Sequence, residues 1–240
     1  MRAGLVACGW LCMATLYSGV SPNQQITATG RVEVFKSGGT QKADPQGVVV
    51  WLIPANPTEA MAASAKTHVQ LLQKQKTFSP HVLVVPVGSS VDFPNRDPFF
   101  HNVFSLFEGK RFDLGLYEAG TTRSVLFNRA GISYIFCNIH PEMSAVVIAL
   151  KTPYYAISDR KGTLSFPQMP TGRYELHVWH ERVLSETLES QTRSILVSET
   201  SSFLGTIRLT EDRTLSQKHQ NKYGQDYDTS TPSNPIYSRP

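Results

Sequence analysis

The chain contains few cysteines, no strong excess of charge of either sign and no long apolar run after its first 20 residues. Its 240 residues include three cysteines, and the formal net charge is +4 at pH 7. No block rich in lysine and arginine follows a helical face, so we expect no nucleic-acid partner. The apolar fraction of 40% and the charged fraction of 18% are those of an ordinary soluble protein with a sizeable core.

The N-terminus has the pattern of a secretory signal. Met1 and Arg2 give a positive start, residues 3–20 are apolar or small, and the polar stretch SPNQQ follows. We predict a signal peptide over residues 1–21 and a periplasmic or secreted protein with no membrane span after cleavage. An uncleaved anchor is the alternative, because about 18 apolar residues are just enough to span a bilayer.

Export leaves the mature chain with a single thiol. Cys8 and Cys12 leave with the signal, so Cys137 has no partner for an internal disulfide. A lone thiol in an oxidising compartment is either buried and inert or held by something else.

The rest of the chain is predicted to be β-structure with many turns, since the full sequence contains 15 prolines, 16 glycines and nine tyrosines. Runs with β-branched residues or two-residue alternation indicate strands. The exception is a helix start at Asn56, with Pro57 and Glu59 following as its first-turn signals. The predicted regions are 25–55, 68–151, 152–209 and a polar, disordered tail over 210–240.

A short turn carries three side chains of metal-ligand type. Cys137, His140 and Met143 follow one another at intervals of three, and His101 ends a proline-rich stretch upstream. Two imidazoles, a thiolate and a thioether suit copper best. Zinc usually takes four strong ligands, and calcium takes carboxylates and other oxygens.

The two stretches around these residues resemble a cupredoxin site. They are FPNRDPFFHNVFS, residues 93–105, and GISYIFCNIHPEMSAVVIAL, residues 131–150. The cysteine–histidine–methionine spacing, with Pro141 after the histidine, is similar to the ligand loop of amicyanin and shorter than that of plastocyanin. The resemblance implies a Greek-key β-sandwich over about residues 68–151 and one mononuclear type 1 (blue) copper.

The same resemblance assigns roles to individual residues. It implies equatorial ligands at His101, Cys137 and His140, an axial ligand at Met143, and in Asn102 a neighbour that ties the ligand loops together and orients the thiolate. Amicyanin has an aromatic residue where this chain has Glu142, so the surface offered to a docking partner differs.

The flanking stretches, GRVEVF…GVVVWLIPA and AISDRKGTLSFPQMPTGRYELHVWHE, resemble the two halves of a transthyretin-like, carboxypeptidase-regulatory sandwich. We therefore expect an all-β chain. A cupredoxin-like sandwich would be combined with a second, discontinuous β-sandwich formed by residues 25–55 and 152–209. This arrangement is similar to that of two-part exported proteins described as methylamine utilization protein-like.

The ligand set predicts a copper-binding electron-transport protein and not an enzyme, because such a site leaves no open position for a substrate. Its partners would be transient redox proteins and a copper donor. Two alternatives remain. The protein could handle copper without cycling it, although it has no tract rich in methionine or histidine, or it could be a non-redox cell-envelope binding protein with a vestigial copper site.

Other candidate residues carry weaker signals. A catalytic pair of Cys137 with a histidine would leave Met143 and the second histidine without a role. We expect His177 and His180 to be structural or surface residues, since they are three apart in a strand and so point to opposite faces. Four acidic residues lie in separate turns, where we expect them to be solvated: Asp92, Asp97, Asp113 and Glu118.

Overall fold

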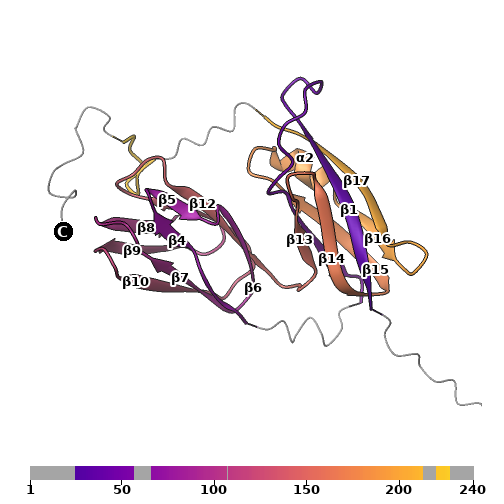
Figure 1. The fold of residues 1–240 in the computed structure, drawn as a ribbon, viewed down its shortest axis with the longest axis horizontal. Helices are drawn as coiled ribbons and strands as arrows, with labels where there is room; N and C mark the ends of the chain where they lie inside the picture. Colours follow the sequence, from indigo (N-terminus) through magenta and orange to yellow (C-terminus); the bar gives the residue numbers. More distant parts are fainter. Residues whose placement is uncertain (1–24, 57–65, 107, 213–219, 228–240) are drawn as a thin grey trace, which may run out of the picture.

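The computed structural model describes residues 25–56, 66–106, 108–212 and 220–227, and nearly all of its regular structure is β-strand (Figure 1). The prediction of an all-β chain is confirmed. The strands form two modules, which we call the insert module, residues 66–150, and the outer module, residues 25–54 and 155–212.

The insert module consists of two main sheets around one core. A five-stranded sheet has the order β6-β12-β11-β8-β9, a three-stranded sheet has the order β10-β7-β3, and β4 and β5 form a hairpin. Its strands are β3 (His68–Gln70), β4 (Leu72–Lys74), β5 (Thr77–Ser79), β6 (Val82–Pro86), β7 (Ser89–Pro94), β8 (His101–Ser105), β9 (Phe112–Tyr117), β10 (Thr122–Phe127), β11 (Gly131–Cys137) and β12 (Ser144–Leu150).

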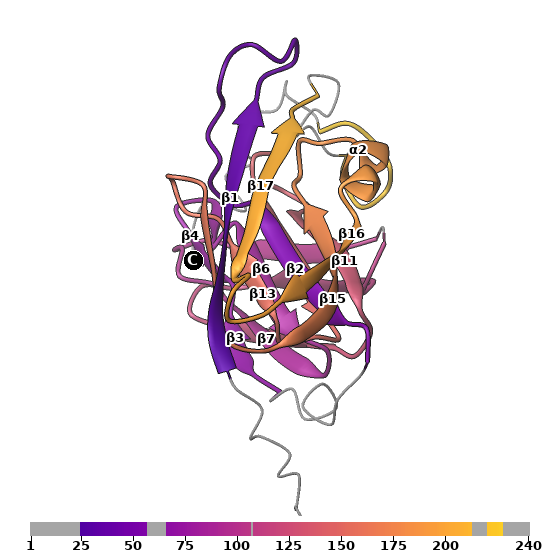
Figure 2. The same ribbon diagram turned by 90° about the vertical axis from the view of Figure 1, so that its right-hand side faces the viewer.

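The outer module is built from strands on either side of the insert module in the sequence. Its sheets have the orders β14-β1-β17 and β13-β2-β15-β16, and a short helix, α2 (Ser185–Ser190), follows β15 (Figure 2). Its strands are β1 (Gln25–Phe35), β2 (Val49–Pro54), β13 (Tyr155–Ile157), β14 (Thr163–Pro170), β15 (Gly172–Trp179), β16 (Arg193–Val197) and β17 (Phe203–Thr210).

Strand β12 explains why the two modules pack against each other. Its sequence, SAVVIAL, is apolar throughout, and all but its first residue are buried. Ala145, Val147 and Ala149 face the insert module's core, whereas Val146 and Ile148 belong to a second core that contains outer-module residues such as Leu52. A strand buried on both faces requires a continuous apolar run and not an alternating one. Burial of each Val or Ile side chain contributes roughly 1.5–3 kcal/mol.

Several predicted segments lie at or beyond the limits of the described residues. The signal peptide over residues 1–21 lies outside them, and so do residues 57–65 of the predicted helix. Among the described residues, no helix has the length and hydropathy needed to cross a membrane. Within the tail that we expected to be disordered, residues 220–227 instead make defined hydrogen bonds with the insert module.

A charged pair links the modules at the surface. His81 lies just before β6 in the insert module, and its Nε2 is 2.6 Å from Oε2 of Glu181 in the outer module. The hydrogen bond with Glu181 raises the pKa of His81 above its usual 6.5, against the effect of burial, and the pKa of Glu181 is lowered even though its own burial opposes this.

Replacing His81 with glutamine should lower the melting temperature by about 1–2 °C at pH 6, because a partly exposed pair contributes only about 0.5 kcal/mol. The raised pKa means that the contribution is complete below pH 6.5 and disappears as the pH rises through the folded-state value. Melting curves of both proteins between pH 5.5 and 9 measure this difference. Glu181→Gln should remove the same pH-dependent increment, and a difference that stays constant across the range would contradict the assignment.

Candidate metal centre

The start of β8 and the end of its antiparallel partner β11 lie side by side, so the loops at these two strand ends meet. His101 begins β8, Cys137 ends β11, and the two strands pair antiparallel with Cys137 opposite Val103. His140 lies in the turn that leads from β11 to β12. One ligand atom from each of the three residues lies within 4.8 Å of the others. The structure thus brings together three of the predicted ligands.

The distances suit a bound first-row metal ion. Sγ of Cys137 lies 3.7 Å from Nδ1 of His101 and 3.5 Å from Nδ1 of His140. A metal ion bonded to nitrogen at about 2.0 Å and to sulfur at about 2.3 Å, with a nitrogen–metal–sulfur angle of about 115°, separates these two donor atoms by about 3.6 Å. The residues present therefore fit a metal held by one sulfur and two imidazole nitrogens.

Met143, the predicted fourth ligand, closes the same turn. Its N–H donates to the carbonyl of His140 at 3.1 Å, and its own carbonyl accepts from the N–H of Cys137 at 3.2 Å. Its side chain is fully buried in the core cluster that contains Cys137. The fold therefore buries the thioether in the same apolar core as the thiol, away from solvent.

The backbone around Cys137 favours a sulfur anion. Burial raises the pKa of the Cys137 thiol, but the N–H groups of Asn102, Ile139 and His140 donate to the sulfur and partly offset this effect. Donors fixed in place before a metal arrives orient the sulfur and reduce the cost of its charge.

Asn102 links the two loops through its backbone. Its carbonyl accepts from the N–H of Asn138 at 3.3 Å, whereas its side-chain Nδ2 donates to Oδ1 of Asp113 at 2.7 Å. The predicted link between the loops thus runs through the main chain, and the side chain connects instead to β9.

Asp97 is the functional residue that the sequence analysis missed. We expected a solvated turn residue, but Asp97 is only 5% exposed, and its Oδ2 accepts from Nε2 of His101 at 2.9 Å. The N–H groups of Gln75 and Lys76 also donate to it. Burial alone would raise the pKa of Asp97, but these bonds together lower it. A carboxylate behind a metal-binding histidine fixes the ring's orientation and tautomer. The four-residue spacing between Asp97 and His101 was the available signal.

Both imidazoles are kept neutral, as a metal ligand must be. Burial lowers the pKa of His101 and outweighs the opposing effect of Asp97. Burial, followed by the charges of His101 and Lys76, lowers the pKa of His140 to about 4. The ring of Phe99 packs against both imidazoles, with its centroid 5.3 Å from that of His101 and 5.5 Å from that of His140.

The three ligand-type residues differ in their access to solvent. His101 and Cys137 are completely buried, whereas His140 is half-buried. The ring of His140 is therefore the ligand through which the centre meets the surface, and exposed Glu142 lies two residues away from it.

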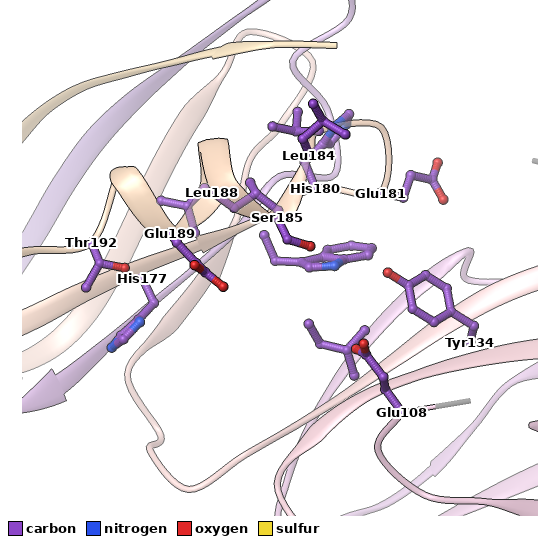
Figure 3. A pocket seen from close by; sticks show the side chains of 14 residues that line it. Glu108, Tyr134, His177, His180, Glu181, Leu184, Ser185, Leu188, Glu189 and Thr192 are labelled. Atoms are coloured by element: carbon purple, nitrogen blue, oxygen red, sulfur yellow. The ribbon is translucent and has the colours of Figure 1, made fainter. Parts of the chain in front are cut away.

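His177 and His180 belong to a different place in the fold. Both line a pocket of about 400 Å³ between β15, α2 and β11, in which Figure 3 shows Tyr134 and Glu108 opposite Ser185 and Glu189. His177 stacks on Trp51 with ring centroids 5.3 Å apart. His180 is buried, and this burial lowers its pKa to about 4. Across residues 25–56, 66–106, 108–212 and 220–227, the only metal-type cluster of three or more is that of His101, Cys137 and His140.

Comparison with known proteins finds similarity only among solved structures. No protein-family model matches the chain, and no curated protein does. A copper-containing nitrite reductase, NirK, from Thermus scotoductus SA-01 is 25% identical over 34% of this chain and 22% of its own, with a TM-score of 0.33. A purple cupredoxin from Nitrosopumilus maritimus is 23% identical over 35% of this chain and 100% of its own, with a TM-score of 0.31.

A reduced amicyanin variant is 22% identical over 42% of this chain and 99% of its own, with a TM-score of 0.32. The structural neighbours are cupredoxins. Each match covers less than half of this chain, and the match to the nitrite reductase covers about a fifth of that protein.

Replacing Asp97 with asparagine should weaken metal binding about 10- to 100-fold, as loss of a carboxylate partner of a histidine ligand does elsewhere. The change keeps the side chain's size but removes the charge that receives Nε2–H of His101. Competition of the full chain with a chelator for cobalt(II) measures the affinity. Asp92→Asn is the matched control, because Asp92 pairs with His68 and Ser124 instead. Equal affinities for the two variants would contradict the role of Asp97.

Proposed function

We propose that the chain is an exported type 1 copper protein that carries single electrons between redox partners and is not an enzyme. The observation that carries this proposal is the convergence of two imidazole Nδ1 atoms on one fully buried sulfur. His101, Cys137 and His140 would hold the ion, with Met143 as the weak fourth ligand. When bound, copper would supply one-electron chemistry, since thiolate and imidazole donors suit both of its oxidation states.

The fixed positions of the ligands support electron transfer over catalysis. His101 is held by Asp97, and Cys137 is held by backbone donors and by a strand pair. Ligands that are held in this way move little when the charge at the centre changes, which keeps the reorganisation cost of an electron's arrival small.

The surface near His140 is the proposed exit for electrons. Phe99 lies beside this ring, and Lys76 lies over the ring of Phe99 with its Nζ 5.7 Å from the centroid. An apolar contact with charged side chains at its rim suits a small, transient interface with a redox protein. The partners and the periplasmic or secreted location remain part of the proposal, as does the signal peptide over residues 1–21.

The first test is optical. The purified mature protein should turn intensely blue with copper(II) and bleach reversibly with ascorbate, because the thiolate of Cys137 gives the absorption. Cys137→Ser should lose the colour entirely, whereas Ser133→Ala, on the same buried face of β11, should keep it. An unchanged spectrum in Cys137→Ser would rule out the thiolate. Colourless protein with tight copper(I) binding would favour copper handling, and no binding would favour a non-redox binding protein.

The second test concerns the fourth ligand. Met143→Leu should keep the blue colour but raise the reduction potential, because removing a weak sulfur donor destabilises copper(II) more than copper(I). A redox titration of the absorption measures the potential. Met169→Leu is the matched control, since Met169 is equally buried but lies in the core of the outer module. Identical shifts in both variants would remove Met143 from the site.

A further inference from the structure

Residues 220–227, which we call the C-terminal strap, lie against the candidate metal centre. Figure 1 shows this segment beside the insert module and far from β17, the strand that precedes it in the chain. Tyr227 donates its hydroxyl hydrogen to the carbonyl of Cys137 at 2.7 Å. Lys222 donates its backbone N–H to Oδ1 of Asn138 at 2.9 Å. The strap thus contacts the ligand turn at its first two residues.

The strap also reaches the loop that carries the other histidine. Nζ of Lys222 lies 2.8 Å from Oδ2 of Asp113, and the second oxygen of Asp113 accepts from the side chain of Asn102, the residue after His101. Lys222 is therefore connected to both ligand loops, through Asp113 to one and through Asn138 to the other. No other charged side chain is hydrogen-bonded to the carboxylate of Asp113 among the residues that the structure describes.

The strap has a defined shape of its own. The amide N–H groups of Tyr223 and Gln225 both donate to Oδ1 of Asn221, and Asn221 and Gln225 are also joined through their backbones at 2.9 Å. Gly224 has a φ of 73°, which glycine adopts without strain. Such a turn presents Lys222 and Tyr227 to the insert module together.

The burial and charge of these two residues indicate a fitted contact. Tyr227 is half-buried where its hydroxyl meets the carbonyl of Cys137. The hydrogen bond with Asp113 raises the pKa of Lys222, whose side chain is only 23% exposed. In the same segment, Tyr223 is 71% exposed, and its ring lies against Lys222, whose Nζ is 5.4 Å from the ring centroid.

We propose that Lys222 and Tyr227 are positioning residues of the metal centre, and that the C-terminal strap clamps the two ligand loops together. This inference rests on the proposed copper function. Tyr227 restrains the peptide at which the ligand turn begins, and Lys222 neutralises the carboxylate that holds Asn102.

Rates of copper loss from the full chain test the clamp. Tyr227→Phe removes one hydrogen bond and should speed the loss of copper(I) to a chelator by about two- to tenfold. Tyr174→Phe removes a matching bond from a tyrosine hydroxyl to a carbonyl, that of Pro170 in the outer module, and should leave the rate unchanged. Melting curves of the metal-free proteins show whether the variants fold equally well. A lower melting temperature with unchanged copper loss, spectrum and potential would reduce the strap to a structural element and overturn the proposal.

The reduction potential tests Lys222. Lys222→Gln leaves the carboxylate of Asp113 without its cation, which favours the more positive copper(II) and should lower the potential. Lys222→Arg keeps the charge and should restore it. Unchanged potential in Lys222→Gln would overturn the role of Lys222.

The strap and the proposed function can fail separately. Blue wild-type protein with unaltered variants would reject the strap alone. If the wild-type protein binds copper without a blue colour, and the strap variants lose copper faster than the wild type, electron transfer alone would be rejected. Absence of any copper binding by the wild-type chain would reject both.

Discussion

The pairing of β8 with β11 is the constraint on which the candidate centre depends. The paired residues are Phe104 with Phe136 and Val103 with Cys137, and the N–H of Asn138 then donates to the carbonyl of Asn102. Because antiparallel neighbours bring the start of one strand beside the end of the other, His101 lies next to Cys137 although 36 positions separate them. A slip of one residue would turn the thiol to the opposite face of the sheet.

The strand that supplies the sulfur is supported on both faces. Ile135 and Cys137 face the core of the insert module, while Tyr134, on the other side of β11, packs against the core shared with the outer module. Tight packing on both faces resists the local movement that a change of charge at the sulfur would otherwise cause. The outer module therefore supports the centre through this shared core.

The sequence allowed the ligand-type residues to be found but not their supports. Cys137, His140 and Met143 stand on one turn and have rare side-chain chemistry, so a local pattern identifies them. For Asp97 the sequence offered only its four-residue spacing from His101, because the burial of its carboxylate arises only when the turn at Gln75 and Lys76 folds over it. The polar tail lacks the apolar residues that predict a fold, and its residues 220–227 dock through hydrogen bonds instead. The two-faced burial of β12, in contrast, could be anticipated from its unbroken apolar run.

The arrangement of charge around the centre follows from how each acidic residue is satisfied. Asp97 is buried and has no lysine or arginine partner among the described residues. Two backbone N–H groups and the ring of His101 donate to its carboxylate without neutralising it, so its field acts directly on that ligand. Asp113 lies nearer to solvent, and Lys222 cancels much of its charge. One uncompensated anion behind a buried ligand favours the higher-charged state of a bound ion, whereas burial of the whole cluster favours the lower-charged state. The strap, by neutralising the second anion, leaves Asp97 as the anion that opposes the effect of burial.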